Sequence, residues 1–128
     1  MSPNPYLERQ AKKGVSSHGT RYEEIAATSL GARLHPASGA LSGAKSDAST
    51  KEVRFEMKSS VYHTLTLHLK WLVKIATEAM GAGQVPAVVI AFVDTNGKPK
   101  MERNAEWVCI PKWKFDELME KSHADIKL

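Results

Sequence analysis

The sequence predicts an α/β fold in which helices pack against a central sheet. Residues 20–30 and 68–80 place apolar side chains at helical spacing. Residues 85–93 form a nearly continuous apolar run, which is typical of a central strand buried on both faces. Residues 53–58 alternate apolar and charged side chains with the period of a strand. Because helical and strand patterns follow one another along the chain, we expect an α/β fold.

The chain has 128 residues, which is long enough for one core and too short for two. We expect a single domain over residues 20–128, preceded by a flexible basic arm over residues 1–19. Lys12 and Lys13 lie in this arm, which either contributes to DNA binding or is a solvated tail. The shares of 42% hydrophobic and 25% charged residues are those of a globular protein and indicate neither a disordered nor a fibrous class.

The first helix is expected from Thr20 to Leu30 and should end at Gly31. Glu23 lies at the edge of its apolar stripe and leans toward the sheet. Glu24 points about 100° away and should be solvated. Glu23 is therefore the acidic residue of this helix that we expect near the sheet.

A loop rich in glycine and small residues covers residues 35–46, and Asp47 follows it. In the strand over residues 53–58, the apolar side chains should face the core. The charged side chains share the opposite face, and they are Arg54, Glu56 and Lys58.

The second helix is expected over residues 68–80, ended by Gly81 and Gly83, and residues 65–67 form either a short strand or its lead-in. Asn96 and Gly97 indicate a turn that leads to an antiparallel partner of the apolar strand.

The end of the chain should contribute one more strand and one more helix. Residues 107–110 are typical of a strand, and residues 112–121 predict a closing helix. Three of its side chains are available for packing, namely Trp113, Leu118 and Met119.

Charge and composition restrict the function. A net charge of +4 and a pI of about 9.2 favour a polyanionic partner. The single cysteine, Cys109, lacks neighbours at zinc-finger spacing and is expected to be a small buried hydrophobe. No apolar run has the roughly 20 residues of a membrane helix, so we expect a cytoplasmic protein with no membrane partner.

Glu56 and Lys58 leave one strand face about 7 Å apart. This spacing suits a carboxylate that binds a divalent cation beside an ammonium that activates water or stabilises charge on a phosphate. Asp47 can supply a second metal oxygen, and the backbone carbonyl of Met57 a third, which is an adequate set for Mg²⁺. The competing interpretation is a strand with a solvated, charged face.

Glu23, Asp47 and Glu56-Met57-Lys58 occur in an order that resembles the PD-(D/E)XK nuclease superfamily. The nearest likeness is to the archaeal-type Holliday-junction resolvases and their phage relatives. It extends over residues 14–115 and includes three short segments, namely residues 19–24, Pro36-Ala37-Ser38-Gly39 and residues 55–60. Ser46 stands where the motif has its proline.

The resemblance implies a restriction-endonuclease-like mixed β-sheet flanked by α-helices. It also implies a Mg²⁺-dependent endodeoxyribonuclease, with Mn²⁺ able to substitute, that acts as a homodimer on four-way DNA junctions in a bacterial, archaeal or phage-infected cell. Glu23, Asp47 and Glu56, with the Met57 carbonyl, are the expected metal ligands. The expected catalytic residues are Glu23, Asp47, Glu56, Lys58 and Ser38, although the Ser38 hydroxyl is equally well interpreted as a loop cap.

Basic residues surround these acids in the sequence and are the expected DNA contacts, namely Arg21, Arg33, Lys45, Lys51, Arg54, Lys12 and Lys13. A generally charged surface is the alternative. The histidines are expected to be structural or exposed, and the tryptophans to lie in the core or a dimer interface. Two other functions stay open: a nuclease for flaps, ends or duplex DNA, and a nuclease-fold DNA-binding module without catalysis.

Overall fold

The computed structural model describes residues 17–35, 46–101 and 104–125. Within these residues the chain forms three helices and five strands. In chain order they are α2 (Ser17–Leu30), β1 (Arg33–Leu34), β2 (Ala48–Ser49), β3 (Val53–Ser60), α3 (Leu69–Ala82), β4 (Val85–Phe92), β5 (Glu106–Cys109) and α4 (Lys112–Asp125).

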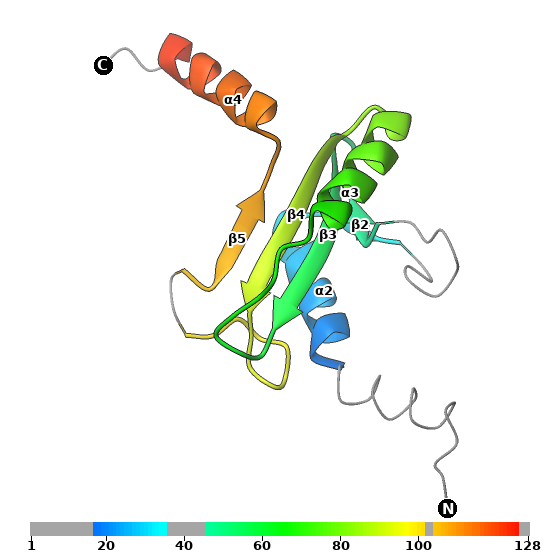
Figure 1. Cartoon of the computed structure of the whole chain (residues 1–128), viewed down its shortest axis with the longest axis vertical. Coiled ribbons are helices and arrows are strands. Elements are labelled where there is room, and N and C mark those ends of the chain that lie inside the picture. The colour runs from blue at the N-terminus through cyan, green and yellow to red at the C-terminus, as the bar shows by residue number, and fades with distance from the viewer. Residues whose placement is uncertain (1–16, 36–45, 102–103, 126–128) are drawn as a thin grey trace, which may run out of the picture.

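The strands form one mixed sheet in the order β1-β2-β3-β4-β5. β3 and β4 are parallel and are joined by α3, whereas the other neighbouring strands are antiparallel. Figure 1 shows α3 in front of the sheet and α2 behind it. The expected α/β fold with a mixed sheet flanked by helices is confirmed, and the arrangement is compatible with a restriction-endonuclease-like fold.

The core has a part on each side of the sheet. On the α2 side, a cluster of buried side chains joins the helix to three strands, and it includes Tyr22, Ala26, Ala48, Phe55, Met57, Ala87 and Val89. On the α3 side, the fully buried side chains are Ile75, Ala79 and Val88. β4 is therefore buried on both faces, as its apolar run predicts.

The helix boundaries differ from expectation by a few residues. α2 begins at Ser17, so residues 17–19 belong to a helix and not to the expected arm. Residues 1–16 lie outside the described part of the chain. α3 contains Gly81 and ends at Gly83, which adopts the left-handed conformation with φ of 68°. Residues 65–67 are a lead-in to α3 rather than a strand.

The turn at Asn96-Gly97 is present, but it produces only a short pairing. Gly97 has φ of 80°, and a Cβ there would lie 2.6 Å from the backbone oxygen of His18 in α2, so both conformation and space require glycine. After the turn the chain makes one bridge, between Val93 and Pro99. The long antiparallel partner of β4 is β5, which begins later, at Glu106.

One competing interpretation is excluded and one expectation about packing is wrong. A solvated charged face on β3 is excluded at Glu56, because α3 covers this side of the strand and Glu56 is only 7% exposed. The side chains of Trp113, Leu118 and Met119 do not pack into the core, because α4 extends away from the edge of the sheet after β5 (Figure 1).

Candidate functional site

The candidate site lies where β2 stops covering β3. β2 pairs only with Arg54 and Phe55. Two residues beyond Phe55 in β3, the backbone N–H of Met57 donates a hydrogen bond of 2.7 Å to Oδ2 of Asp47. A residue in a strand directs its N–H and C=O to the same side. The Met57 carbonyl therefore faces the same edge as the Asp47 carboxylate.

Glu56 lies on the α3 side of the sheet, between two lysines. Its Oε1 lies 3.5 Å from Nζ of Lys58, and its Oε2 lies 3.9 Å from Nζ of Lys74, which is beyond hydrogen-bonding distance. Among the described residues, Oε2 has no hydrogen-bond partner although it is buried. Burial raises the pKa of Glu56, the charge of Asp47 raises it further, and the two lysines lower it. Burying a carboxylate oxygen without a hydrogen-bond donor costs free energy of folding, unless a ligand interacts with that oxygen.

Lys58 is held by an aromatic ring as well as by Glu56. Its Nζ lies 4.5 Å from the ring centroid of Trp71, at the start of α3. The ring of His68 meets Trp71 edge to face, with centroids 4.7 Å apart. The Lys58 ammonium is therefore oriented from two directions, while its side chain stays 30% exposed.

Glu23 approaches the same edge from the opposite layer. It lies on α2 and is half-buried, whereas its neighbour Glu24 is exposed, as expected. Burial, followed by the charges of Asp47 and Glu56, raises the pKa of Glu23 to about 7. The fold thus brings three carboxyl groups close enough for their charges to repel one another.

The donor set fits a hard divalent cation only in part. Within the described residues, no three His, Cys, Asp or Glu side chains converge in the way that a metal centre built from side chains requires. Mg²⁺ needs fewer protein ligands, because it keeps several waters and is bound through one or two carboxylates. Asp47, the buried Oε2 of Glu56 and the Met57 carbonyl meet that smaller requirement.

One edge of α3 supplies residues that the sequence interpretation missed. Trp71 contacts Lys58, Lys74 lies beside Glu56, and Glu78 accepts a hydrogen bond of 2.9 Å from the backbone N–H of Ser46. These positions recur at helical spacing, just outside the apolar stripe of α3. The sequence signal that could have identified these residues was a row of mainly polar side chains along the border of the helix face that packs on the sheet.

The expected DNA-binding residues are spread over the molecule. Arg21 donates to Asn96 near the carboxyl end of β4, whereas Lys51 lies in the turn before β3, at the other end of the sheet. Arg54 is half-buried and donates to Gln84 and Ser46. Arg33 is exposed in β1. Three of the expected DNA contacts, Lys12, Lys13 and Lys45, lie outside the described part of the chain. So does Ser38, which was an expected catalytic residue.

His35 supports the segment that carries Asp47. Its Nδ1 lies 2.6 Å from the backbone oxygen of Ser46, and its Nε2 lies 2.8 Å from Oγ of Ser49. This is the structural function expected for a histidine. It anchors the residues on either side of Asp47.

No protein-family model matches this chain, and searches of curated proteins and of solved structures return no significant match. Within residues 17–35, 46–101 and 104–125, none of the helices has both the length and the apolar character needed to cross a bilayer.

Proposed function

We propose that this chain is a Mg²⁺-dependent DNA endonuclease of the PD-(D/E)XK type. The observation that carries the proposal is the grouping of Asp47, Glu56 and Lys58 at one sheet edge, where a buried Glu56 oxygen has no hydrogen bond among the described residues. We further propose that its substrate is a four-way DNA junction, cleaved in paired strands by a cytoplasmic homodimer. The resemblance of residues 19–24, 36–39 and 55–60 to the Holliday-junction resolvases supports this substrate.

Asp47, Glu56 and the Met57 carbonyl would hold the ion, with Mn²⁺ able to replace Mg²⁺. A bound divalent cation polarises phosphate oxygens and lowers the pKa of its water. Lys58, held by Glu56 and Trp71, faces the same space and stabilises negative charge on a scissile phosphate or orients the attacking water. Glu23, with its pKa of about 7, accepts or donates a proton at the rim of the site.

The proposal is tested with a labelled four-way junction and its component duplexes, each incubated with and without Mg²⁺. Wild-type protein should cut the junction in a Mg²⁺-dependent way. Asp47→Asn and Glu56→Gln should each lower the cleavage rate by at least about 100-fold. Both variants should still bind the junction, because phosphate contacts supply most of the affinity.

Glu24→Gln is the matched control, because it removes a carboxylate that is exposed on α2. It should cleave like the wild type. If Mg²⁺-dependent cutting survives both Asp47→Asn and Glu56→Gln, the site is wrong. If junction and duplex are cut at equal rates, the chemistry stands and the junction specificity does not.

A further inference from the structure

The strand β5 and the helix α4 expose an unusual number of large apolar side chains. Six of them have exposed fractions between 42 and 58%, and they are Trp107, Val108, Trp113, Phe115, Leu118 and Met119. We call these six residues the β5–α4 surface. Among the described residues, α4 makes no extensive contact with another element, and Figure 1 shows it extending beyond the sheet. A 14-residue helix without tertiary packing is marginal in water.

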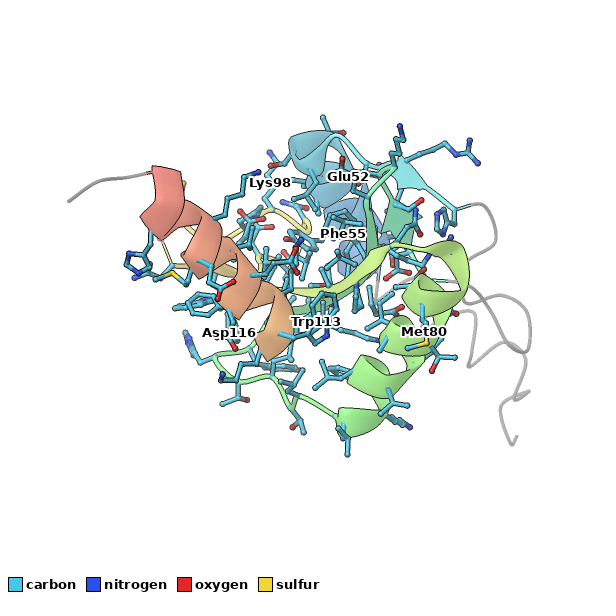
Figure 2. The ribbon with its side chains drawn as sticks, turned by 90° about the horizontal axis from the view of Figure 1, so that it is seen from above. Glu52, Phe55, Met80, Lys98, Trp113 and Asp116 are labelled. Atoms are coloured by element: carbon cyan, nitrogen blue, oxygen red, sulfur yellow. The ribbon has the colours of Figure 1, made fainter. Side chains whose placement is uncertain are left out.

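An apolar groove of about 730 Å³ opens beside this surface, between α3 and β5. Its walls include Leu72, Val73 and Met80 from α3, together with Ile110 and Trp113. Figure 2 shows Trp113 on the side of α4 that faces α3. Each chain therefore carries a protruding helix with four exposed apolar side chains, and next to it an apolar groove.

We propose that the β5–α4 surface and this groove form the contact with a second copy of the same chain. Under a two-fold axis the same patch meets itself, so that α4 of each copy lies against the groove of the other. The contact would give the homodimer of the proposed function a defined surface. It does not depend on whether the chain cleaves DNA.

The available area is that of a stable dimer. The exposed parts of the six side chains, with those of Val73 and Met80 in the groove wall, amount to roughly 800 Å² of mainly apolar surface. Each partner buries about that area in a specific interface.

The charges of this surface favour a second copy over DNA. From Glu106 to Lys121 the chain has three lysines and four acidic residues, a net charge of −1, although the whole chain is +4. Lys112 pairs with Asp116 at 2.8 Å, and Lys114 pairs with Glu117 at 3.3 Å, so these charges are matched within α4. Nucleic acid requires an excess of cations, which this surface lacks.

The strand order separates this surface from the candidate site. β5 is one edge of the sheet, and the Asp47–Glu56 edge lies beyond β3 on the other side. Two copies joined through β5 and α4 would leave both candidate sites accessible.

The test is the mass of the full chain in solution, measured without DNA or Mg²⁺ by sedimentation and light scattering. We expect about 28 kDa at micromolar concentration, twice the 14.1 kDa of one chain. The double variant Phe115→Glu and Leu118→Glu should raise the dissociation constant at least about 100-fold. Both residues are already half-exposed, so circular dichroism should be unchanged.

Tyr62→Glu is the matched control, because Tyr62 is 73% exposed, follows the carboxyl end of β3 and is not part of the β5–α4 surface. It should remain dimeric. Cys109 lines the groove and gives a second measurement. In the wild type, the rate of thiol labelling should fall as the protein concentration rises. In the double variant, the rate should be the same at every concentration.

A wild-type chain that stays at 14.1 kDa at about 100 μM would overturn the proposal, and so would a double variant that remains dimeric. Neither result touches the nuclease proposal, because association is measured without substrate. Conversely, a dimer that fails to cleave any DNA would leave this surface standing and remove the proposed activity.

Discussion

At the β2 side of the sheet the fold buries carboxyl groups, whereas at the β5 side it exposes tryptophan, phenylalanine and leucine. Glu56 is 7% exposed and lies among other acids, while Trp113 on α4 is 58% exposed. Burying a charge and exposing a large apolar side chain both cost free energy of folding. Folding of one chain explains neither arrangement, so each edge is the basis of one of the two proposals: a bound cation at the first edge and a second chain at the second.

The largest expected effect comes from removing the ammonium at the charged edge. Lys58→Met keeps the length of the side chain and its contact with Trp71 but removes the charge. Cleavage under single-turnover conditions should slow by about 100- to 1,000-fold, because charge on the scissile phosphate is no longer stabilised. Lys70→Met serves as the control, since Lys70 is an exposed lysine of the same helix, α3. Equal losses in the two variants would show that overall charge matters and not the position of Lys58.

A smaller effect is expected from the ring that holds Lys58. Trp71→Leu should lower the cleavage rate by about 3- to 30-fold, the range that corresponds to losing one cation–π contact. Trp71→Phe keeps a ring face and should recover most of the rate. If phenylalanine restored nothing, the contact would have no part in positioning Lys58.

The smallest effect concerns stability and its pH dependence. The pKa of Glu23 is raised from 4.5 to about 7, so its protonated form is favoured in the folded state. Its contribution to stability is fully present below pH 4.5 and is lost as the pH rises through 7. Since the group is half-exposed, Glu23→Gln should raise the free energy of unfolding at pH 8 by only about 1 to 2 kcal/mol, and by almost nothing at pH 4.

Urea unfolding of the wild type, Glu23→Gln and the exposed control Glu24→Gln at several pH values measures this difference. Glu24→Gln should follow the wild type. If Glu23→Gln were no more stable than the wild type at pH 8, the carboxyl groups would not be crowded at this edge. The comparison between the two edges would then lose its main support.

Local periodicity was sufficient for most of the elements. The spacing of Tyr22, Ala26 and Leu30 placed Glu23 and Glu24 on different sides of α2, and the structure agrees. Alternation in β3 placed Glu56 and Lys58 on one face, where they form an ion pair. These relations join residues within one element, so the geometry of that element determines them.

Contacts between elements were not predictable in the same way. The position of Lys74 beside Glu56 and of Trp71 beside Lys58 depends on how α3 settles on β3. A shift of α3 by one helical turn would have given Glu56 and Lys58 different neighbours. The turn at Gly97 was expected, but β5 begins only at Glu106, because a turn signal does not specify where long pairing resumes.

The sequence by itself determined the α/β class, the three helices, the strands β3, β4 and β5, and which acidic and basic residues of β3 share a face, since these follow from side-chain period and backbone geometry. The tertiary structure alone decided that Glu56 is buried beneath α3 and that α4 leaves its apolar residues exposed. The physical reason is that an apolar or charged pattern states which environment a side chain requires. Only the packing of the chain shows whether the same molecule provides it.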